Sequence, residues 1–357
     1  MTERPTSDRD TIVLVYPGDA ELDLMNALGR DGVGEPLIEL GKRLRQLGYR
    51  FEQAIDQSAS RVAGAIFWNM RAAQYGRGLR GVARRIRYGN RGRDWKAELL
   101  AEGIGERMVL VLREPPCRVP ENYDVALHRG FGRILTWRDD LVDGTRYLKL
   151  HVAVPVGFPA NAELVDFADK KLLVCISANK FSSHPLELYS ERRDAVEFFA
   201  EAIPDDFDVY GRGWDCDPAK TPQSYRGVVP EKWPVYRRYR FALAYENCAD
   251  MPGLIAEQGL DCLRSDCVPV YLGAPNVCDY IDPECYVDRR EFRSNEQLLR
   301  YLESVGRDEY ERYRSAISRY LGGESFARFL TPAFVDTMCD ALRLEARPLV
   351  CGGDELP

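Results

Sequence analysis

Short runs of consecutive apolar residues recur along the first half of the chain, and polar or helix-forming stretches separate them. Four of these runs are predicted β-strands: TIVLVYP (11–17), AGAIFW (63–68), RMVLVLRE (107–114) and RILTW (133–137). After the first run, Leu37, Leu40, Leu44 and Leu47 recur at the spacing of one helix face, and the strand-like YRFEQA follows them. This order of elements predicts a parallel sheet covered by helices, so we expect the first half to be Rossmann-like.

The same alternation begins again after a connection that contains Pro155, Gly157 and Pro159. The second set of predicted strands is LLVCIS (172–177), DFDVYG (206–211), YRFALAYE (239–246) and VPVYLG (268–273). Predicted helices lie at 186–202, 253–264, 295–305 and 307–321, and the apolar segment 326–342 fits core packing. We therefore predict an α/β protein with two domains, residues 1–158 and 159–345.

The composition supports two packed domains and argues against some classes of protein. Of 357 residues, 45% are hydrophobic, which is enough to build a core in each domain. The 49 Lys and Arg against 56 Asp and Glu give a net charge of −7, which argues against a nucleic-acid-binding protein. The start, MTERPTSDRD, is too polar for a signal peptide or a membrane anchor. We expect a cytoplasmic protein whose contact with membranes is at most peripheral.

Potential metal ligands are few and scattered. The histidines His128, His151 and His184 are too far apart in the sequence for a zinc centre, and the ten cysteines form no C-x-x-C pair. Asp215 and Asp217 form a D-x-D pair that could hold a divalent cation, but no second acidic cluster supports it. The sequence therefore predicts no metal site.

Residues 71–96 carry the strongest local charge bias in the chain, with eight arginines and three interleaved aromatic residues. Such a stretch can dock an anionic acceptor or lie at a membrane surface. The simpler interpretation is a solvated helix and loop that pair with acidic neighbours, and the sequence leaves these alternatives open.

Familiar catalytic motifs are missing from the sequence: we find no G-x-S-x-G elbow, Walker loop or kinase motif. GRGWD (211–215) follows a predicted strand, so Gly211 can form a tight turn at the strand end where α/β proteins bind ligands. By itself this motif does not specify an activity.

Four segments of the second half, read in order, resemble one enzyme family. They are FALAYEN (241–247), PGLIAEQGLDCL (252–263), VPVYLGAPNVCDYI (268–281) and YVDRREFRSNEQLLRYL (286–302). In this order they resemble the donor-binding half of the α-1,3/α-1,4-fucosyltransferases, glycosyltransferase family 10, in a bacterial-type member. SANKFSSHPLELYSERR (177–193) and, in the first half, LREPPCRVPENYD followed by FGRILTWRDDLVDG extend the resemblance.

The resemblance implies a GT-B fold, in which two Rossmann-like domains face each other across a cleft. The first domain would bind the acceptor and the second the nucleotide-sugar donor, with a terminal helix that packs back on the first. An inverting sugar transfer needs a carboxylate that takes the proton from the attacking hydroxyl. Glu114 ends an apolar strand and matches the family's proposed general base; the alternative is a loop carboxylate beside Arg113.

On the donor side, the resemblance implies roles for Asn247, Glu246 and Glu257. Asn247 matches the asparagine that contacts the donor, while Glu246 either contacts it too or only braces its loop. Glu257 matches the acid that hydrogen-bonds the nucleotide ribose; the alternative is a solvated helix face. Tyr245 is one of several aromatic residues that either stack on the base or sugar or pack in the core.

Two residues depart from the family pattern. Gln258 stands where the family has a lysine that neutralises phosphate charge, and Leu254 stands where it has a tyrosine. Either another cation replaces the lysine, or the donor differs, or the activity is weak. The candidate replacements are Lys180, Arg192, Arg193 and Arg212, and for Lys180 and Arg192 the alternative is a surface residue.

The sequence thus predicts an inverting glycosyltransferase that transfers L-fucose from GDP-fucose to a hydroxyl of an oligosaccharide or glycolipid acceptor, of the surface-glycan or lipopolysaccharide type. We expect it to need no obligatory cofactor, with a divalent cation at most stimulating the reaction. Two alternatives stay open. One is the same fold with a different nucleotide-sugar donor, and the other is a degenerate protein that binds a glycan or nucleotide without turnover.

Overall fold

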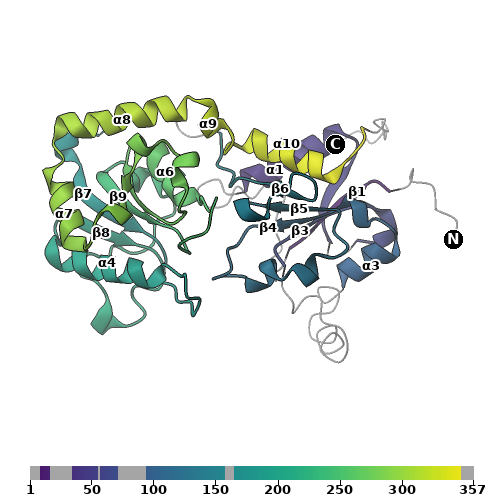
Figure 1. The fold of residues 1–357 in the computed structure, drawn as a ribbon, viewed down its shortest axis with the longest axis horizontal. Helices are drawn as coiled ribbons and strands as arrows, with labels where there is room; N and C mark the ends of the chain where they lie inside the picture. Colours follow the sequence, from purple (N-terminus) through teal and green to yellow (C-terminus); the bar gives the residue numbers. More distant parts are fainter. Residues whose placement is uncertain (1–8, 17–33, 55–56, 71–93, 157–164, 347–357) are drawn as a thin grey trace, which may run out of the picture. The chain divides into compact units, whose positions relative to one another are not determined.

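A computed structural model describes residues 9–16, 34–54, 57–70, 94–156 and 165–346. These residues divide into two compact units, one containing residues up to Leu150 together with those from Thr331 onward, the other running from His151 to Leu330 (Figure 1). The predicted domain boundary at 158/159 and most of the arginine-dense stretch, 71–93, lie outside the described residues.

The first unit is built on one parallel sheet with strand order β2-β1-β3-β4-β5-β6. Its strands are β1 (Thr11–Val15), β2 (Arg50–Gln53), β3 (Val62–Trp68), β4 (Met108–Leu112), β5 (Arg133–Thr136) and β6 (Tyr147–Lys149). The five predicted strands are confirmed. Strand β6 was missed because its three residues are only half-buried and carry no apolar run.

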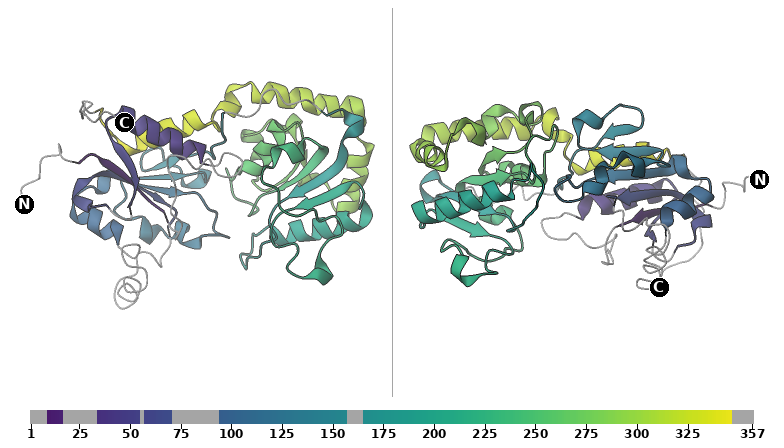
Figure 2. Two further views of the ribbon diagram at one scale, coloured as in Figure 1. Left: turned by 180° about the vertical axis from the view of Figure 1, so that it is seen from behind. Right: turned by 60° about the horizontal axis from the view of Figure 1, so that its bottom comes forward.

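Helices cover both faces of this sheet: α1 (Glu35–Gln46) and α10 (Thr331–Leu342) on one, and α3 (Trp95–Ala101) on the other. The reverse view in Figure 2 shows α1 and α10 side by side, in purple and yellow. Trp68 at the end of β3 meets Phe334 of α10 edge to face, with ring centroids 6.3 Å apart. The last described helix therefore belongs to the core of the first unit, although the rest of the chain's second half does not.

The second unit contains a five-stranded parallel sheet with strand order β11-β10-β9-β7-β8. Its strands are β7 (Lys171–Ile176), β8 (Phe207–Tyr210), β9 (Tyr239–Tyr245), β10 (Val268–Leu272) and β11 (Val287–Asp288). The four predicted strands are confirmed, and the two-residue β11 is too short to give a pattern.

Alternate residues of β7 face different cores, which is why its sequence is apolar throughout. Leu173 and Cys175 pack with residues of α4 and α7, while Val174 and Ile176 pack with residues of α5 and α6. The helices of this unit are α4 (Tyr189–Ala202), α5 (Trp233–Tyr236), α6 (Glu257–Arg264), α7 (Asn295–Ser304), α8 (Arg307–Leu321) and α9 (Glu324–Ala327).

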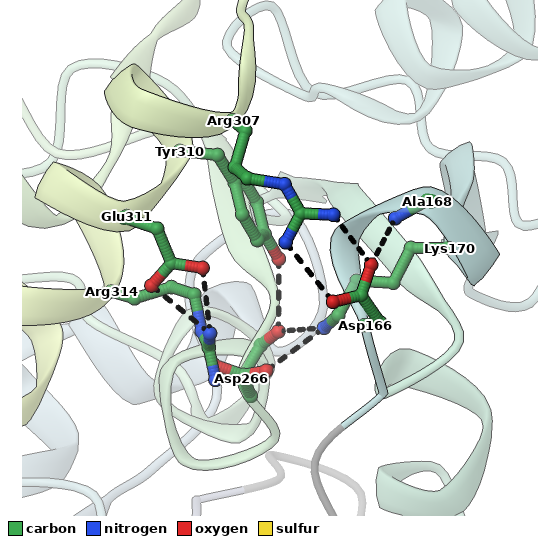
Figure 3. Close-up of polar contacts among 8 residues, drawn as sticks. All are labelled: Asp166, Ala168, Lys170, Asp266, Arg307, Tyr310, Glu311 and Arg314. Atoms are coloured by element: carbon green, nitrogen blue, oxygen red, sulfur yellow. Dashed lines mark hydrogen bonds and ion pairs between the residues drawn. The ribbon is translucent and has the colours of Figure 1, made fainter.

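A charged network fixes α8 to the amino-terminal edge of this sheet (Figure 3). The fully buried ammonium of Lys170, just before β7, lies 3.0 Å from the carboxylate of Asp266, just before β10. From α8, Arg314 contacts the same carboxylate at 2.7 Å and the Tyr310 hydroxyl donates to the Asp266 carbonyl. Because a buried ammonium without its partner costs about 3–5 kcal/mol, this network supports the sheet at the edge opposite the strands' carboxyl ends.

Candidate active site

The carboxyl ends of β7 and β9 form a topological switch point in the second unit. The chain leaves β7 toward β8 on one side, and the next strand, β9, lies on the other side of β7. Open α/β sheets bind their ligands at such a point. Here the two following loops are joined: Leu188 N–H donates to the Asn247 carbonyl at 3.0 Å, and Ala249 N–H donates to the Leu186 carbonyl at 2.8 Å. Asn247 thus lies, half-buried, at the predicted ligand edge.

Glu246 directly follows β9, and its side chain is buried rather than open to a ligand, at 5% exposed. Its Oε1 accepts a hydrogen bond from the Ala256 N–H at 2.8 Å, just before α6 begins. A Cβ at Gly273, after β10, would lie 2.3 Å from Glu246 Cγ, so only glycine fits there. Burial raises the pKa of Glu246 to about 8. Of the two interpretations of Glu246, this geometry favours the brace.

Arg192 of α4 is buried as well, at 3% exposed. Its guanidinium donates to the backbone carbonyls of Tyr245 and Glu246, the latter at 3.0 Å. These bonds hold the end of β9 against α4. The interpretation of Arg192 as a surface residue is therefore wrong, and its predicted contact with a donor stays a prediction.

Tyr245 does not present its ring to a ligand. The side chain is 2% exposed and packs in the larger core of the second unit together with Phe241 and Leu243. The reason is the period of two along a strand, which turns every second side chain of β9 into the same core. This burial favours the alternative, core packing, and the predicted contact of Tyr245 with the donor stays a prediction.

The first turn of α6 carries Glu257 and Gln258, both half-buried. The Gln258 side chain donates from Nε2 to the Leu243 carbonyl in β9 at 2.9 Å. Its amide is thus used to satisfy the strand backbone at the switch point, and it carries no charge. The predicted contacts of Glu257 and Gln258 with a donor stay predictions.

Gly211 has a positional reason to be glycine. Its φ is +135°, and a Cβ there would lie 2.2 Å from the Ser177 carbonyl oxygen. This close approach lets the loop after β8 pair with the loop after β7, where Asn179 N–H donates to the Arg212 carbonyl at 2.9 Å. Lys180 is the next residue of that loop, and its carbonyl accepts from Arg193 Nη1 at 2.6 Å. Gly211 and Lys180 therefore lie at the ligand edge, and their donor contacts stay predictions.

Sequence reasoning missed Glu187, whose carboxylate occupies the amino terminus of α4. It accepts hydrogen bonds from Tyr189 N–H at 2.6 Å and Ser190 N–H at 3.1 Å. Burial opposes the charge, but the bonds from Ser190 and Tyr189 outweigh it and lower the pKa of Glu187. Its position in the first turn of the predicted helix 186–202 was a usable signal for an anion at the helix start. A helix start that could bind phosphate is thus occupied by an anion of this chain.

In the first unit, Glu114 follows β4 at the carboxyl edge of the sheet, as predicted from the sequence. Its side chain is 30% exposed, and Oε2 lies 3.3 Å from Nε of Arg118, four residues further on. Two buried asparagines, Asn69 after β3 and Asn122, hydrogen-bond its backbone. Sequence reasoning assigned no role to Asn69, although a polar residue directly after a buried strand marks the ligand edge of a parallel sheet. Asn122 lay within the family-like string VPENYD without a role of its own.

No three metal-ligating side chains gather anywhere in the described ranges. Asp217 is used locally, since its Oδ1 accepts from the Ala219 N–H at 3.1 Å. Whether the protein uses a divalent cation stays a prediction.

Residues 168–344, which include the switch point, match the family model "Glycosyltransferase family 10 (fucosyltransferase) C-term". The chain belongs to glycosyltransferase family 10. An alpha-(1,4)-fucosyltransferase of Arabidopsis thaliana is 37% identical over 70 residues, 20% of this chain and 17% of that protein. The 3-galactosyl-N-acetylglucosaminide 4-alpha-L-fucosyltransferase of Homo sapiens is 27% identical over 221 residues, 59% of this chain and 53% of that protein. The chain spans about half the length, or less, of these relatives.

Solved structures of an alpha1,3-fucosyltransferase and of other glycosyltransferases share the fold. An alpha1,3-fucosyltransferase with GDP matches at 13% identity, covering 98% of this chain and 96% of that one, with a TM-score of 0.51. The DNA-modifying enzyme beta-glucosyltransferase matches at 9% identity, 94% of this chain and 100% of that one, with a TM-score of 0.51. At such identities the likeness shows the fold alone, and it confirms the predicted GT-B fold. Within the described residues, no helix has both the length and the apolar character needed to cross a membrane.

Proposed function

We propose that this family 10 protein is an inverting glycosyltransferase that transfers L-fucose from GDP-fucose to a hydroxyl of an oligosaccharide or glycolipid acceptor. The observation that carries the proposal is the family match over 168–344, which coincides with a switch point of the kind that binds nucleotides. The partly exposed carboxylate of Glu114, at the carboxyl edge of the sheet of the first unit, supports it.

In the proposed reaction, the Glu114 carboxylate takes the proton of the acceptor hydroxyl while that oxygen attacks the anomeric carbon of the donor. The new carbon–oxygen bond forms as the bond between the anomeric carbon and the diphosphate oxygen breaks. The bonding electrons leave with GDP, and the configuration at the anomeric carbon inverts. The protein then has to stabilise the extra negative charge on the departing diphosphate.

Two side chains at the switch point favour a second candidate. Gln258, which stands in place of a lysine of the family pattern, is neutral and bonded to β9, and Glu187 adds a negative charge at the start of α4. The candidate is the same fold with a different nucleotide-sugar donor, or a protein that binds a nucleotide or glycan without turnover. A divalent cation that accompanies the donor is the alternative source of charge.

Calorimetric titration with GDP, UDP and dTDP, each with and without Mg²⁺, distinguishes these candidates. Micromolar binding of GDP, followed by turnover of GDP-fucose with a β-galactosyl or N-acetylglucosaminyl acceptor, supports the main proposal. Preference for UDP or dTDP supports a different donor. Nucleotide binding with no release of nucleoside diphosphate from any donor, in the presence of acceptors, supports the non-catalytic protein.

The remaining expectations about partners and location stay predictions. The solved relatives include a DNA-modifying enzyme of the same fold, so the expected absence of a nucleic-acid partner needs its own binding assay. The cytoplasmic location and the surface-glycan acceptor likewise await fractionation and acceptor screening.

A further inference from the structure

Three backbone and side-chain donors converge on one side-chain oxygen beside Glu114. Asn69 directly follows β3, and β3 and β4 are neighbours in the sheet, so the ends of the two strands meet. Asn69 Oδ1 accepts from the N–H groups of Arg113 and Glu114, both at 2.9 Å, and from Nδ2 of Asn122 at 2.9 Å. The amide nitrogen of Glu114 is thereby fixed to the neighbouring strand.

The carbonyl of Glu114 is held from the other side. It accepts from Asn122 Nδ2 at 3.0 Å and from the Tyr123 hydroxyl at 3.2 Å. Asn122 is fully buried and is itself fixed, since its Oδ1 accepts from the Met70 N–H at 2.6 Å. Both polar groups of the Glu114 backbone are therefore held by side chains, while its carboxylate is left partly exposed.

The backbone conformation at Asn69 shows that this arrangement has a cost in free energy. Its φ is +65°, in the left-handed region that residues with a Cβ adopt rarely, although asparagine tolerates it best. Asparagine therefore suits this position for two reasons: it tolerates the left-handed backbone conformation, and its side-chain oxygen accepts the three hydrogen bonds. Satisfying buried polar groups alone would explain hydrogen bonds anywhere in the core. It does not explain why those bonds gather on a residue whose own carboxylate is left partly exposed at the sheet edge.

We propose that Asn69, Asn122 and Tyr123 are positioning residues for Glu114, and we call their contacts the Glu114 clamp. This inference rests on the proposed function. Because the clamp fixes the backbone of Glu114, only rotations about the bonds of the Glu114 side chain are needed to bring the carboxylate to the acceptor hydroxyl. A general base has to lie within hydrogen-bond reach of its proton, so the clamp raises the fraction of productive encounters.

Three variants separate the acceptor from the backbone conformation at position 69. Asn69→Gly keeps the left-handed φ without strain but deletes the acceptor oxygen. Asn69→Asp keeps both the φ and an acceptor oxygen, and it adds a charge near Glu114. Asp124→Ala is the matched control: it removes a side-chain hydrogen bond to backbone in the same region, to Ala126 N–H at 3.0 Å, outside the clamp.

In full-chain kinetics, we expect Asn69→Gly to lower kcat by about 10- to 100-fold with donor KM changed less than about threefold. Asn69→Asp should restore most of kcat, with the acidic limb of its pH–rate profile moved to higher pH by the added negative charge. Asp124→Ala should leave kcat unchanged. If Asn69→Gly behaves like Asp124→Ala, or if Asn69→Asp restores nothing and shifts no limb, the clamp is overturned.

Hydrogen exchange at the Arg113 and Glu114 amides separates failure of the clamp from failure of the function. A parent chain that transfers no sugar overturns the proposed function and any catalytic purpose of the clamp with it. When the parent is active, the clamp predicts that protection of these two amides falls in Asn69→Gly and persists in Asn69→Asp. Unchanged protection in Asn69→Gly overturns it, whatever the kinetics.

Discussion

Two glutamates occupy equivalent places in the two sheets and have opposite environments. Glu114 follows β4 and Glu246 follows β9, each at the carboxyl end of a buried parallel strand. At Glu114 the backbone is held and the carboxylate is partly exposed; at Glu246 the carboxyl group is itself buried and hydrogen-bonded. A strand-end position therefore does not by itself make a glutamate catalytic. The two residues differ in which of their groups the neighbouring residues hydrogen-bond: the backbone of Glu114 and the carboxyl group of Glu246.

The largest expected effect separates the two glutamates by turnover. Glu114→Gln removes the proposed base and should lower kcat by about 10²- to 10⁴-fold, while nucleotide affinity stays unchanged. Glu246→Gln keeps the shape and the acceptor for Ala256 N–H, so kcat should stay within about threefold of the parent. The measurement is a steady-state assay of released nucleoside diphosphate. Equal losses in both variants would mean that the comparison between these residues is wrong.

The next effect concerns stability, for which we expect substitution of Glu246 to have a larger effect than substitution of Glu114. Glu246→Ala leaves the Ala256 N–H without its acceptor and opens a cavity, which we expect to cost about 2–4 kcal/mol in the free energy of unfolding. Gly273→Ala should cost about 1–3 kcal/mol, because its Cβ would overlap Glu246. Glu114→Ala should cost less than about 1 kcal/mol, since its ion pair is exposed. Urea denaturation of the three variants checks this order. A larger loss of stability in Glu114→Ala than in Glu246→Ala would contradict it.

Glu246 should also make stability depend on pH. Its pKa is raised from 4.5 to about 8 in the folded state, so between these values the folded chain holds a proton that the unfolded chain has released. The contribution of Glu246 to the free energy of unfolding is therefore fully present below about pH 4.5. It decreases as the pH rises and is lost above about pH 8. The expected size is on the order of a few kcal/mol. The difference in stability between the parent and Glu246→Gln, measured from pH 5 to 9, should show this slope; a flat difference contradicts it.

The smallest expected effect tests the missing charge at the switch point. Gln258→Lys should tighten GDP binding about tenfold, because an ammonium is placed where the family carries one. Gln258→Met is the control, since it loses the bond to the Leu243 carbonyl without adding charge. Calorimetry with GDP gives the ratio of the two affinities. Equal affinities would show that the diphosphate does not lie near this position.

The sequence by itself determined the elements and the family. Consecutive apolar runs such as those at β4 and β7 identify buried parallel strands, because both faces of such strands need apolar side chains. The ordered motifs between 241 and 302 identified the family, since several linked strings are rarely met by chance. Short or polar elements such as β6 carry too little pattern to be found in this way.

Only the tertiary structure decided what each candidate side chain does. The positions of Tyr245 and Glu246 at a strand end, and of Arg192 in a helix, are the same in the sequence whether their side chains bind a ligand or the protein itself. The choice depends on neighbours distant in the chain, such as Gly273 beneath Glu246 and the β9 carbonyls that Arg192 binds. The Glu114 clamp depends likewise on Asn69, more than forty residues away in the sequence, which reaches Glu114 only because β3 and β4 pair side by side.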